Sequence, residues 1–137
     1  MRLRPCANLP HMTRTDRAKE LQNRLPKIYP DAHCELIHSN PLELLVATIL
    51  SAQCTDKRVN IVTHDLFKRC KSAQDYADIS QEELESIVRS TGFYRNKAKN
   101  IRAMGQTLVE RHGGEVPCTL DELASIPGAG RKTANVV

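Results

Sequence analysis

The sequence predicts an all-α protein. Apolar residues recur along the chain with the spacing of helix faces, N-cap residues precede most of these segments, and no run alternates as a β-strand does. The chain has 137 residues, of which 40% are hydrophobic, which is adequate for the core of one compact domain. No apolar run is long enough to cross a bilayer, so we expect a soluble protein.

The first residues combine prolines and basic side chains and lack the apolar stretch of a signal peptide. We expect residues 1–14 to form a disordered extension, and either Met1 or Met12 to be the true start. Residues 15–39 are predicted to form an N-terminal helix and a linker. Thr15 or Asp16 begins this helix, and Pro26 ends or kinks it. One face of the helix is apolar: Ala18, Leu21 and Leu25.

The next helix is predicted to be central and buried. Asn40 is its N-cap, Pro41 takes its first position, and Glu43 is placed to complete a capping box. Its residues are apolar nearly all round, which is typical of a buried helix. They are Leu42, Leu44, Leu45, Val46, Ala47, Ile49 and Leu50.

Three helices are predicted next. Thr55 and Asp56 begin the first, whose inward face is Val59, Val62 and Leu66. Two shorter helices begin after Ser72 and Ser80, with Glu83 at the capping-box position of the second.

A longer amphipathic helix is predicted from about Asn96 to His112. Gly113 and Gly114 end it, because glycine readily adopts the left-handed conformation of a helix C-terminus. Its apolar face is Ala98, Ile101, Leu108 and Val109.

The last segment predicts a helix, a glycine hairpin and a second helix. Thr119 and Glu122 have capping-box spacing, and Pro127 ends the first helix. Gly128 and Gly130 can take positive φ, which lets the backbone approach a partner closely. The amides at the start of the second helix are donors at the positive end of its dipole, so a phosphate oxygen is their natural partner.

Lys132 lies in the first turn of that second helix and has two possible roles. It is either a cation beside the same phosphate or a nucleophile. The positive end of the dipole, with partial burial, favours the neutral amine that forms Schiff bases. Position alone favours the first role.

The charge balance is mildly basic, with 20 Lys and Arg against 16 Asp and Glu, which favours a polyanionic partner. Cations are dense in residues 57–71 and 95–102. We expect the second run, which follows Gly92, to contact phosphate. If that partner is a nucleic acid, Lys97→Ala should weaken binding on all sequences alike and flatten its salt dependence.

The five cysteines, at positions 6, 34, 54, 70 and 118, have neither the spacing of a zinc knuckle nor that of an iron–sulfur loop. The five histidines also lack a ligand pattern. We therefore assign no metal site within this chain, and we expect reduced thiols in a cytosolic protein.

Three segments together resemble one family. They are Pro41–Leu45 leading into Leu50–Asp56, Gly92–Ala98, and the hairpin Ile126–Val137. From about Leu21 to Val137 the chain is similar to endonuclease III, the bifunctional glycosylase and abasic-site lyase that removes oxidised pyrimidines. The resemblance implies a helix-hairpin-helix DNA glycosylase fold. Residues 40–137 would then form its six-helix domain, ending inside the helix-hairpin-helix of residues 119–137.

The resemblance also implies residue roles. Lys132 would be the nucleophile that attacks the sugar carbon and expels the base. Gln53, which by itself reads as a polar residue ending the buried helix, would fill the gap left by the extruded nucleotide. Phe93, ordinarily a core aromatic, would press into the base stack opposite. The residues expected at DNA are Gln53, Phe93, Arg95, Lys97, Gly128, Gly130, Arg131 and Thr133.

The family further requires an aspartate downstream of the lysine and a 4Fe–4S cluster held by four closely spaced cysteines near the C-terminus. No acidic residue follows Lys132. We therefore interpret the chain as C-terminally truncated, with the cluster cysteines of the full-length family beyond residue 137.

The expected partner is double-stranded DNA with damaged pyrimidines or abasic sites. We expect a monomer, with no membrane association, at the nucleoid in a bacterial-type cytoplasm. Two alternatives stay open. One is a relative of the mismatch-adenine glycosylases, against which Lys132 argues because those enzymes lack it. The other is a catalytically silent DNA-binding module that uses only the hairpin.

Overall fold

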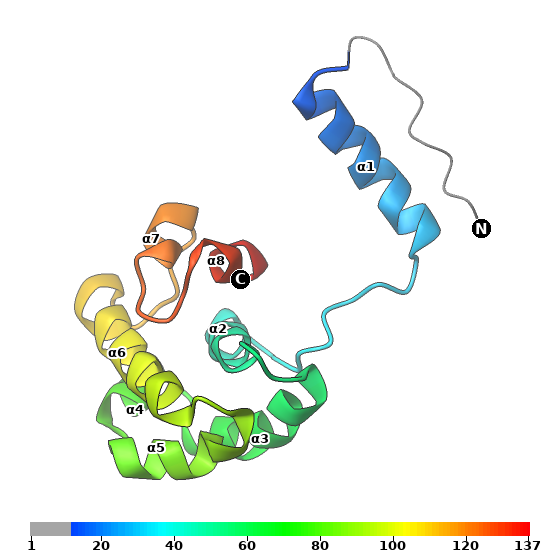
Figure 1. Cartoon of the computed structure of the whole chain (residues 1–137). Coiled ribbons are helices and arrows are strands. Elements are labelled where there is room, and N and C mark those ends of the chain that lie inside the picture. The colour runs from blue at the N-terminus through cyan, green and yellow to red at the C-terminus, as the bar shows by residue number, and fades with distance from the viewer. Residues whose placement is uncertain (1–11) are drawn as a thin grey trace. The chain divides into compact units, whose positions relative to one another are not determined.

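The structure, a computed structural model, describes residues 12–137 (Figure 1). Most of the extension predicted for residues 1–14 lies outside the described residues. Contacts divide the chain into a unit that ends at Cys34 and a unit from Glu35 to Val137. The sequence analysis put this boundary at residue 40. Each unit is described by itself.

The all-α prediction is confirmed, because every regular element within residues 12–137 is helical. The elements are α1 (Arg14–Ile28), α2 (Pro41–Leu50), α3 (Asp56–Arg69), α4 (Ala73–Asp78), α5 (Gln81–Val88), the 3-10 helix η1 (Arg89–Thr91), α6 (Tyr94–His112), α7 (Leu120–Ala124) and α8 (Arg131–Val136). Residues 40–137, predicted to form the glycosylase domain, contain the helices α2 to α8.

Helix α1 begins at Arg14, slightly earlier than predicted. Thr13 is its N-cap and exchanges hydrogen bonds with Asp16 in a complete capping box. Pro26 does not end the helix, which continues to Ile28. No residue of α1 is buried, and its apolar face is exposed at Leu21 and Leu25.

Helix α2 is the central helix of the second unit, as predicted, and contacts α3, α6 and α8 (Figure 1). The side chain of Asn40 accepts a hydrogen bond from the Glu43 amide at 2.9 Å. The capping box is not completed, because the Glu43 carboxylate instead accepts from the amide and the hydroxyl of Ser39, each at 2.7 Å. The buried residues of α2 are Leu45, Val46, Ala47, Ile49 and Leu50.

Helices α4 and α6 approach each other very closely at Gly105. A Cβ at this position would lie 2.8 Å from the carbonyl oxygen of Ala73 and 2.9 Å from the Cβ of Tyr76, so no side chain fits. Gly113 ends α6 in the left-handed conformation predicted for it. The amides of Gly113 and Gly114 both donate to the Leu108 carbonyl, the second at 2.8 Å, which closes the end of the helix.

Helices α3 and α5 are joined by an ion pair that replaces a predicted cap. Ser80 caps α5 by accepting from the Glu83 amide at 3.2 Å. The Glu83 carboxylate does not turn back to close a capping box. It accepts from Arg69 of α3 at 2.7 Å. Both side chains are exposed, so this pair contributes less than about 1 kcal/mol.

Candidate nucleic-acid interface

The predicted hairpin lies between α7 and α8. The Ile126 amide donates to the Leu123 carbonyl and the Ala129 amide to the Ile126 carbonyl, at 3.1 and 3.0 Å. Ile126 and Ala129 are buried, so the turn is anchored in the core at both of its ends. These contacts make the hairpin a fixed part of the domain rather than a loose loop.

Gly128 is at the tip of this turn and has φ of +81°, as predicted. A Cβ here would lie 2.9 Å from the Cβ of Asn100 on α6 and 3.5 Å from Ile49 on α2. Glycine is therefore required twice, by the backbone conformation and by the contact with α6.

Gly130 differs from the prediction, because its φ of −79° is one that any residue can adopt. It is the N-cap of α8, and its carbonyl accepts the Ala134 amide at 2.9 Å. With no side chain on the cap, no side-chain oxygen occupies the amides of the first turn. Glycine here leaves these donors accessible to an external acceptor.

Lys132 and Arg131 open α8 and are both exposed. The partial burial expected of Lys132 is therefore not present in this structure. Thr133 beside them is half-buried. Exposure at the N-terminus of α8 puts two cations beside the accessible amides of that turn, an arrangement that suits an anionic partner.

Gln53 and Phe93 share an unusual backbone. Among residues 12–137 they are the only non-glycine residues with positive φ, at 52° and 46°. The left-handed region costs an ordinary residue about 1–2 kcal/mol. Such strain is typical of functional positions.

Gln53 does not end the buried helix, which stops at Leu50. It lies in the turn that follows, which closes with a bond from the Cys54 amide to the Ser51 carbonyl at 3.1 Å. The residue is exposed.

Phe93 is the N-cap of α6 and follows Gly92, whose φ is +74°. Its side chain is 66% exposed, so the ordinary interpretation as a core aromatic is wrong. A large apolar side chain held out in water by a strained backbone gains nothing for the isolated domain.

Arg95 is exposed, and its guanidinium lies 5.7 Å from the centre of the Tyr94 ring. Arg89 lies at the same distance from that ring. The sequence analysis did not select Arg89 or Tyr94. Together with Phe93 they place apolar and cationic groups side by side at the start of α6.

Lys97 does not have the position expected of a phosphate ligand. It is only 5% exposed, and its Nζ donates to the carbonyls of Leu50 and Thr91 at 2.9 and 2.8 Å. Burial lowers the pKa of this amine below its usual value. The predicted loss of salt dependence in Lys97→Ala therefore has no structural basis.

A sequence signal for this burial existed. Lys97 is four, seven and eleven residues before Ile101, Met104 and Leu108, which places it on the buried face of α6. The predicted apolar face began at Ala98 because a lysine was assigned to solvent.

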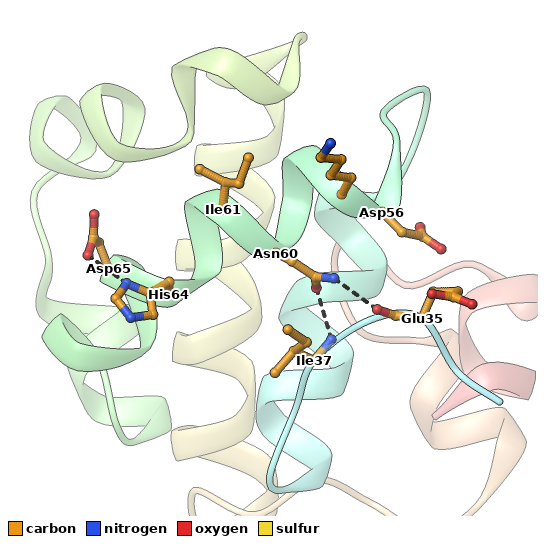
Figure 2. A pocket seen from close by; sticks show the side chains of 8 residues that line it. Glu35, Ile37, Asp56, Asn60, Ile61, His64 and Asp65 are labelled. Atoms are coloured by element: carbon orange, nitrogen blue, oxygen red, sulfur yellow. Dashed lines mark hydrogen bonds and ion pairs between the residues drawn. The ribbon is translucent and has the colours of Figure 1, made fainter.

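A groove with a volume of about 790 Å³ lies elsewhere in the second unit, along α3. Figure 2 shows Ile37 and Ile61 there among Glu35, Asp56 and Asp65. The Asn60 amide accepts from the Ile37 amide and donates to the Glu35 carbonyl, both at 2.9 Å, which ties residues 35–37 to α3. The carboxylates of Glu35, Asp56 and Asp65 make this groove unsuited to a polyanion. The groove is therefore separate from the candidate interface.

Within residues 12–137, no group of three or more His, Cys, Asp or Glu side chains is arranged to hold a metal ion. The buried Cys70 has its pKa raised to about 11 by desolvation.

In the described part of the chain, no helix is both long and apolar enough to cross a membrane.

Residues 46–137 match the family model of the HhH-GPD superfamily base excision DNA repair proteins. The chain belongs to this superfamily. Among curated HhH-GPD relatives, endonuclease III of Bacillus subtilis (strain 168) is 53% identical over 122 residues, covering 87% of this chain and 56% of the relative. The predicted resemblance to endonuclease III is confirmed.

Solved structures agree on the HhH-GPD fold. A trapped endonuclease III–DNA covalent intermediate in an estranged-adenine complex has a TM-score of 0.80 and 50% identity, over 91% of this chain and 59% of that one. A thermostable thymine-DNA glycosylase has a TM-score of 0.78 at 17% identity, over 89% and 58% of the two chains, and shows the fold alone. The chain thus spans a little over half the length of these HhH-GPD relatives.

Proposed function

We propose that this HhH-GPD chain belongs to an enzyme of DNA base excision repair, a DNA glycosylase with abasic-site lyase activity. The observation that carries the proposal is the exposed Lys132 in the first turn of α8, next to a hairpin anchored in the core. A trapped covalent intermediate with DNA is known for the 50% identical endonuclease III, which supports the proposal from that relative.

The proposed reaction begins at the Lys132 amine. Its lone pair forms a bond to the anomeric carbon of deoxyribose. At the same time the glycosidic bond breaks, the base leaves with the two electrons of that bond, and the base takes up the proton that the newly bonded nitrogen loses. Ring opening gives a Schiff base. Loss of the adjacent C2′ proton then breaks the C3′–oxygen bond by β-elimination, and water releases the lysine.

The neighbouring residues bind and open the duplex in this proposal. The Gly128–Gly130 backbone, with Arg131 and Thr133, holds phosphate at the start of α8. Gln53 and Phe93 enter the duplex where the damaged nucleotide leaves it.

The proposed substrate class is oxidised pyrimidines and abasic sites in double-stranded DNA. We propose that the enzyme acts as a monomer and is associated with the nucleoid. Arg95 is the phosphate ligand proposed at α6, because it is exposed where Lys97 is not.

The cofactor of the endonuclease III family, a 4Fe–4S cluster, does not fit the residues described. Four closely spaced thiolates are needed. Cys34, Cys54, Cys70 and Cys118 belong to different segments, and no cluster of metal-binding side chains forms within residues 12–137. No step of the proposed reaction passes through the cluster.

A silent DNA-binding module is the second candidate. It is favoured by the lack, in the part of the chain described, of an ion pair between Lys132 and a carboxylate that could accept its proton. A mismatch-adenine glycosylase is disfavoured by Lys132 itself.

Borohydride trapping on duplex DNA with an abasic site separates the candidates. The 137-residue chain should give a covalent adduct that Lys132→Ala abolishes and Arg131→Ala retains. Binding without an adduct would overturn the lyase for this chain and support the silent module. A fusion of this chain to the remaining part of the Bacillus subtilis relative then tells whether Lys132 reacts when the rest of the fold is supplied.

A further inference from the structure

Among the described residues, only Lys97 hydrogen-bonds the ends of both α2 and η1 through its side chain. Its ammonium bonds Leu50, the last residue of α2, and Thr91, the last residue of η1. Gln53 lies three residues after the first of these carbonyls, and Phe93 two residues after the second. One buried cation thus lies at the base of both strained loops.

A lysine at this position carries a cost as well as a gain in stability. Burying an ammonium among carbonyl dipoles, with no carboxylate paired to it in the described residues, carries a desolvation cost. An apolar residue of similar volume would avoid that cost and fill the same space on α6, but would leave the two carbonyls without this donor. Buried polar groups of this kind are kept in some proteins because they fix one arrangement among several.

The carbonyls that Lys97 binds are well placed to transmit such a constraint. Leu50 ends a helix, where carbonyls lack an intrahelical partner and a cation is favoured by the dipole. Thr91 is itself held, because it is 2% exposed and its hydroxyl donates to the Val88 carbonyl at 2.7 Å. Only one residue, Gly92, separates Thr91 from Phe93.

We propose that Lys97 is a positioning residue for DNA opening: its ammonium fixes the spacing between the Gln53 loop and the Phe93 loop. The two side chains must enter one duplex at neighbouring points, so their separation has to match the gap in the base stack. This inference rests on the proposed insertion of Gln53 and Phe93. Lys97 itself touches no DNA.

The test separates insertion from binding. The 137-residue chain is titrated against a duplex that contains a tetrahydrofuran abasic analogue with 2-aminopurine beside it. Fluorescence anisotropy measures total binding, and 2-aminopurine fluorescence measures unstacking. Lys97→Met should keep binding within about threefold, yet lower the unstacking signal about tenfold, because small misplacements of positioned groups have large effects.

Two controls are matched to Lys97→Met. Lys99→Met removes an exposed charge two residues further along α6 and should leave unstacking unchanged. Ile101→Val trims the same buried face and should also leave unstacking unchanged. Equal loss of unstacking in Ile101→Val would mean that Lys97 serves ordinary core stability, and would overturn the proposal.

A rescue experiment gives a second measurement. In Lys97→Ala, added propylammonium replaces the missing part of the side chain and should restore unstacking, whereas tetramethylammonium, which has no N–H donor, should not. Failure of propylammonium to restore any signal would also count against the proposal.

The double variant Gln53→Ala, Phe93→Ala separates failure of this inference from failure of the proposed function. If this variant unstacks 2-aminopurine normally, the insertion roles are wrong. If it is defective while Lys97→Met is normal, only the role of Lys97 is overturned.

Discussion

The starts of α6 and α8 each carry a lysine within the first turn, and the two lysines have opposite environments. Lys97 is buried and bonded to two carbonyls, whereas Lys132 is exposed beside amides that no side chain caps. Both lie in basic stretches of sequence, and both were expected at DNA. The difference teaches that the face of the helix, and not the local density of charge, decides which lysine can reach a partner.

The largest expected effect is the loss of covalent trapping on DNA when Lys132 is replaced. Lys132→Ala should lower borohydride-trapped adduct by at least about a hundredfold, because the nucleophile is removed. Its free energy of unfolding should change by less than about 0.5 kcal/mol, as for other exposed residues. If Lys132→Ala gave more trapped adduct than Lys97→Met, the roles assigned to the two lysines would be wrong.

The largest stability effect belongs to Lys97. Lys97→Ala should lower the free energy of unfolding by about 3 kcal/mol, because it leaves two buried carbonyls unsatisfied and opens a cavity. Lys97→Met, which keeps the volume, should lose about half as much. Urea denaturation followed by circular dichroism measures both. A wild-type midpoint in Lys97→Ala would show that the two carbonyl bonds are not made in solution.

The burial of Lys97 should also appear in the pH dependence of stability. Because burial lowers the pKa of Lys97 below 10.5, the unfolded chain binds a proton that the folded chain lacks in the interval between the two values. The corresponding stability is present above 10.5 and is lost as the pH falls through the folded pKa.

The measurement is a difference between variants, which cancels the other titrating groups. Wild type should gain stability relative to Lys97→Met as the pH rises toward 10.5. Parallel curves for wild type and Lys97→Met would rule out a perturbed Lys97.

A smaller effect is expected at the loops that the buried lysine joins. Gln53→Gly should raise the free energy of unfolding by about 1 kcal/mol, since glycine adopts φ of 52° without strain. The same variant should unstack 2-aminopurine less well. A loss of stability would show that Gln53 is not strained in the unbound protein.

The smallest effect concerns salt. Arg95→Ala should reduce the slope of log affinity against log salt by about one, because one phosphate contact is lost, while Lys97→Met leaves the slope unchanged. Affinities measured at several salt concentrations decide this. A reduced slope in Lys97→Met alone would restore the expectation drawn from the basic run.

Much of the fold followed from local signals. Asn40, Thr55, Ser72 and Ser80 each cap the helix predicted after them, because a cap depends only on residues within one turn. Carboxylate partners were predicted less well. Glu43 and Glu83 bind Ser39 and Arg69 instead of closing capping boxes, since a flexible side chain takes whichever donor the tertiary structure brings nearest.

The candidate site divides in the same way. The positive φ of Gly128 was predictable from a glycine hairpin, whereas the left-handed backbone of Gln53 and Phe93 was not, because side chains disfavour it. Lys97 and the Leu50 carbonyl that it binds are 47 residues apart in sequence, and no local pattern encodes such a contact.

A substitution at Gly105, which lies outside the candidate interface, can inactivate this protein. It lies where α4 and α6 touch, with backbone atoms 2.8 Å from any Cβ added there. An extra methyl group would push the two helices apart and tilt α6, the helix that Phe93 caps. Heating would widen the gap further, so Gly105→Ala is where we would look for a conditional, heat-sensitive allele.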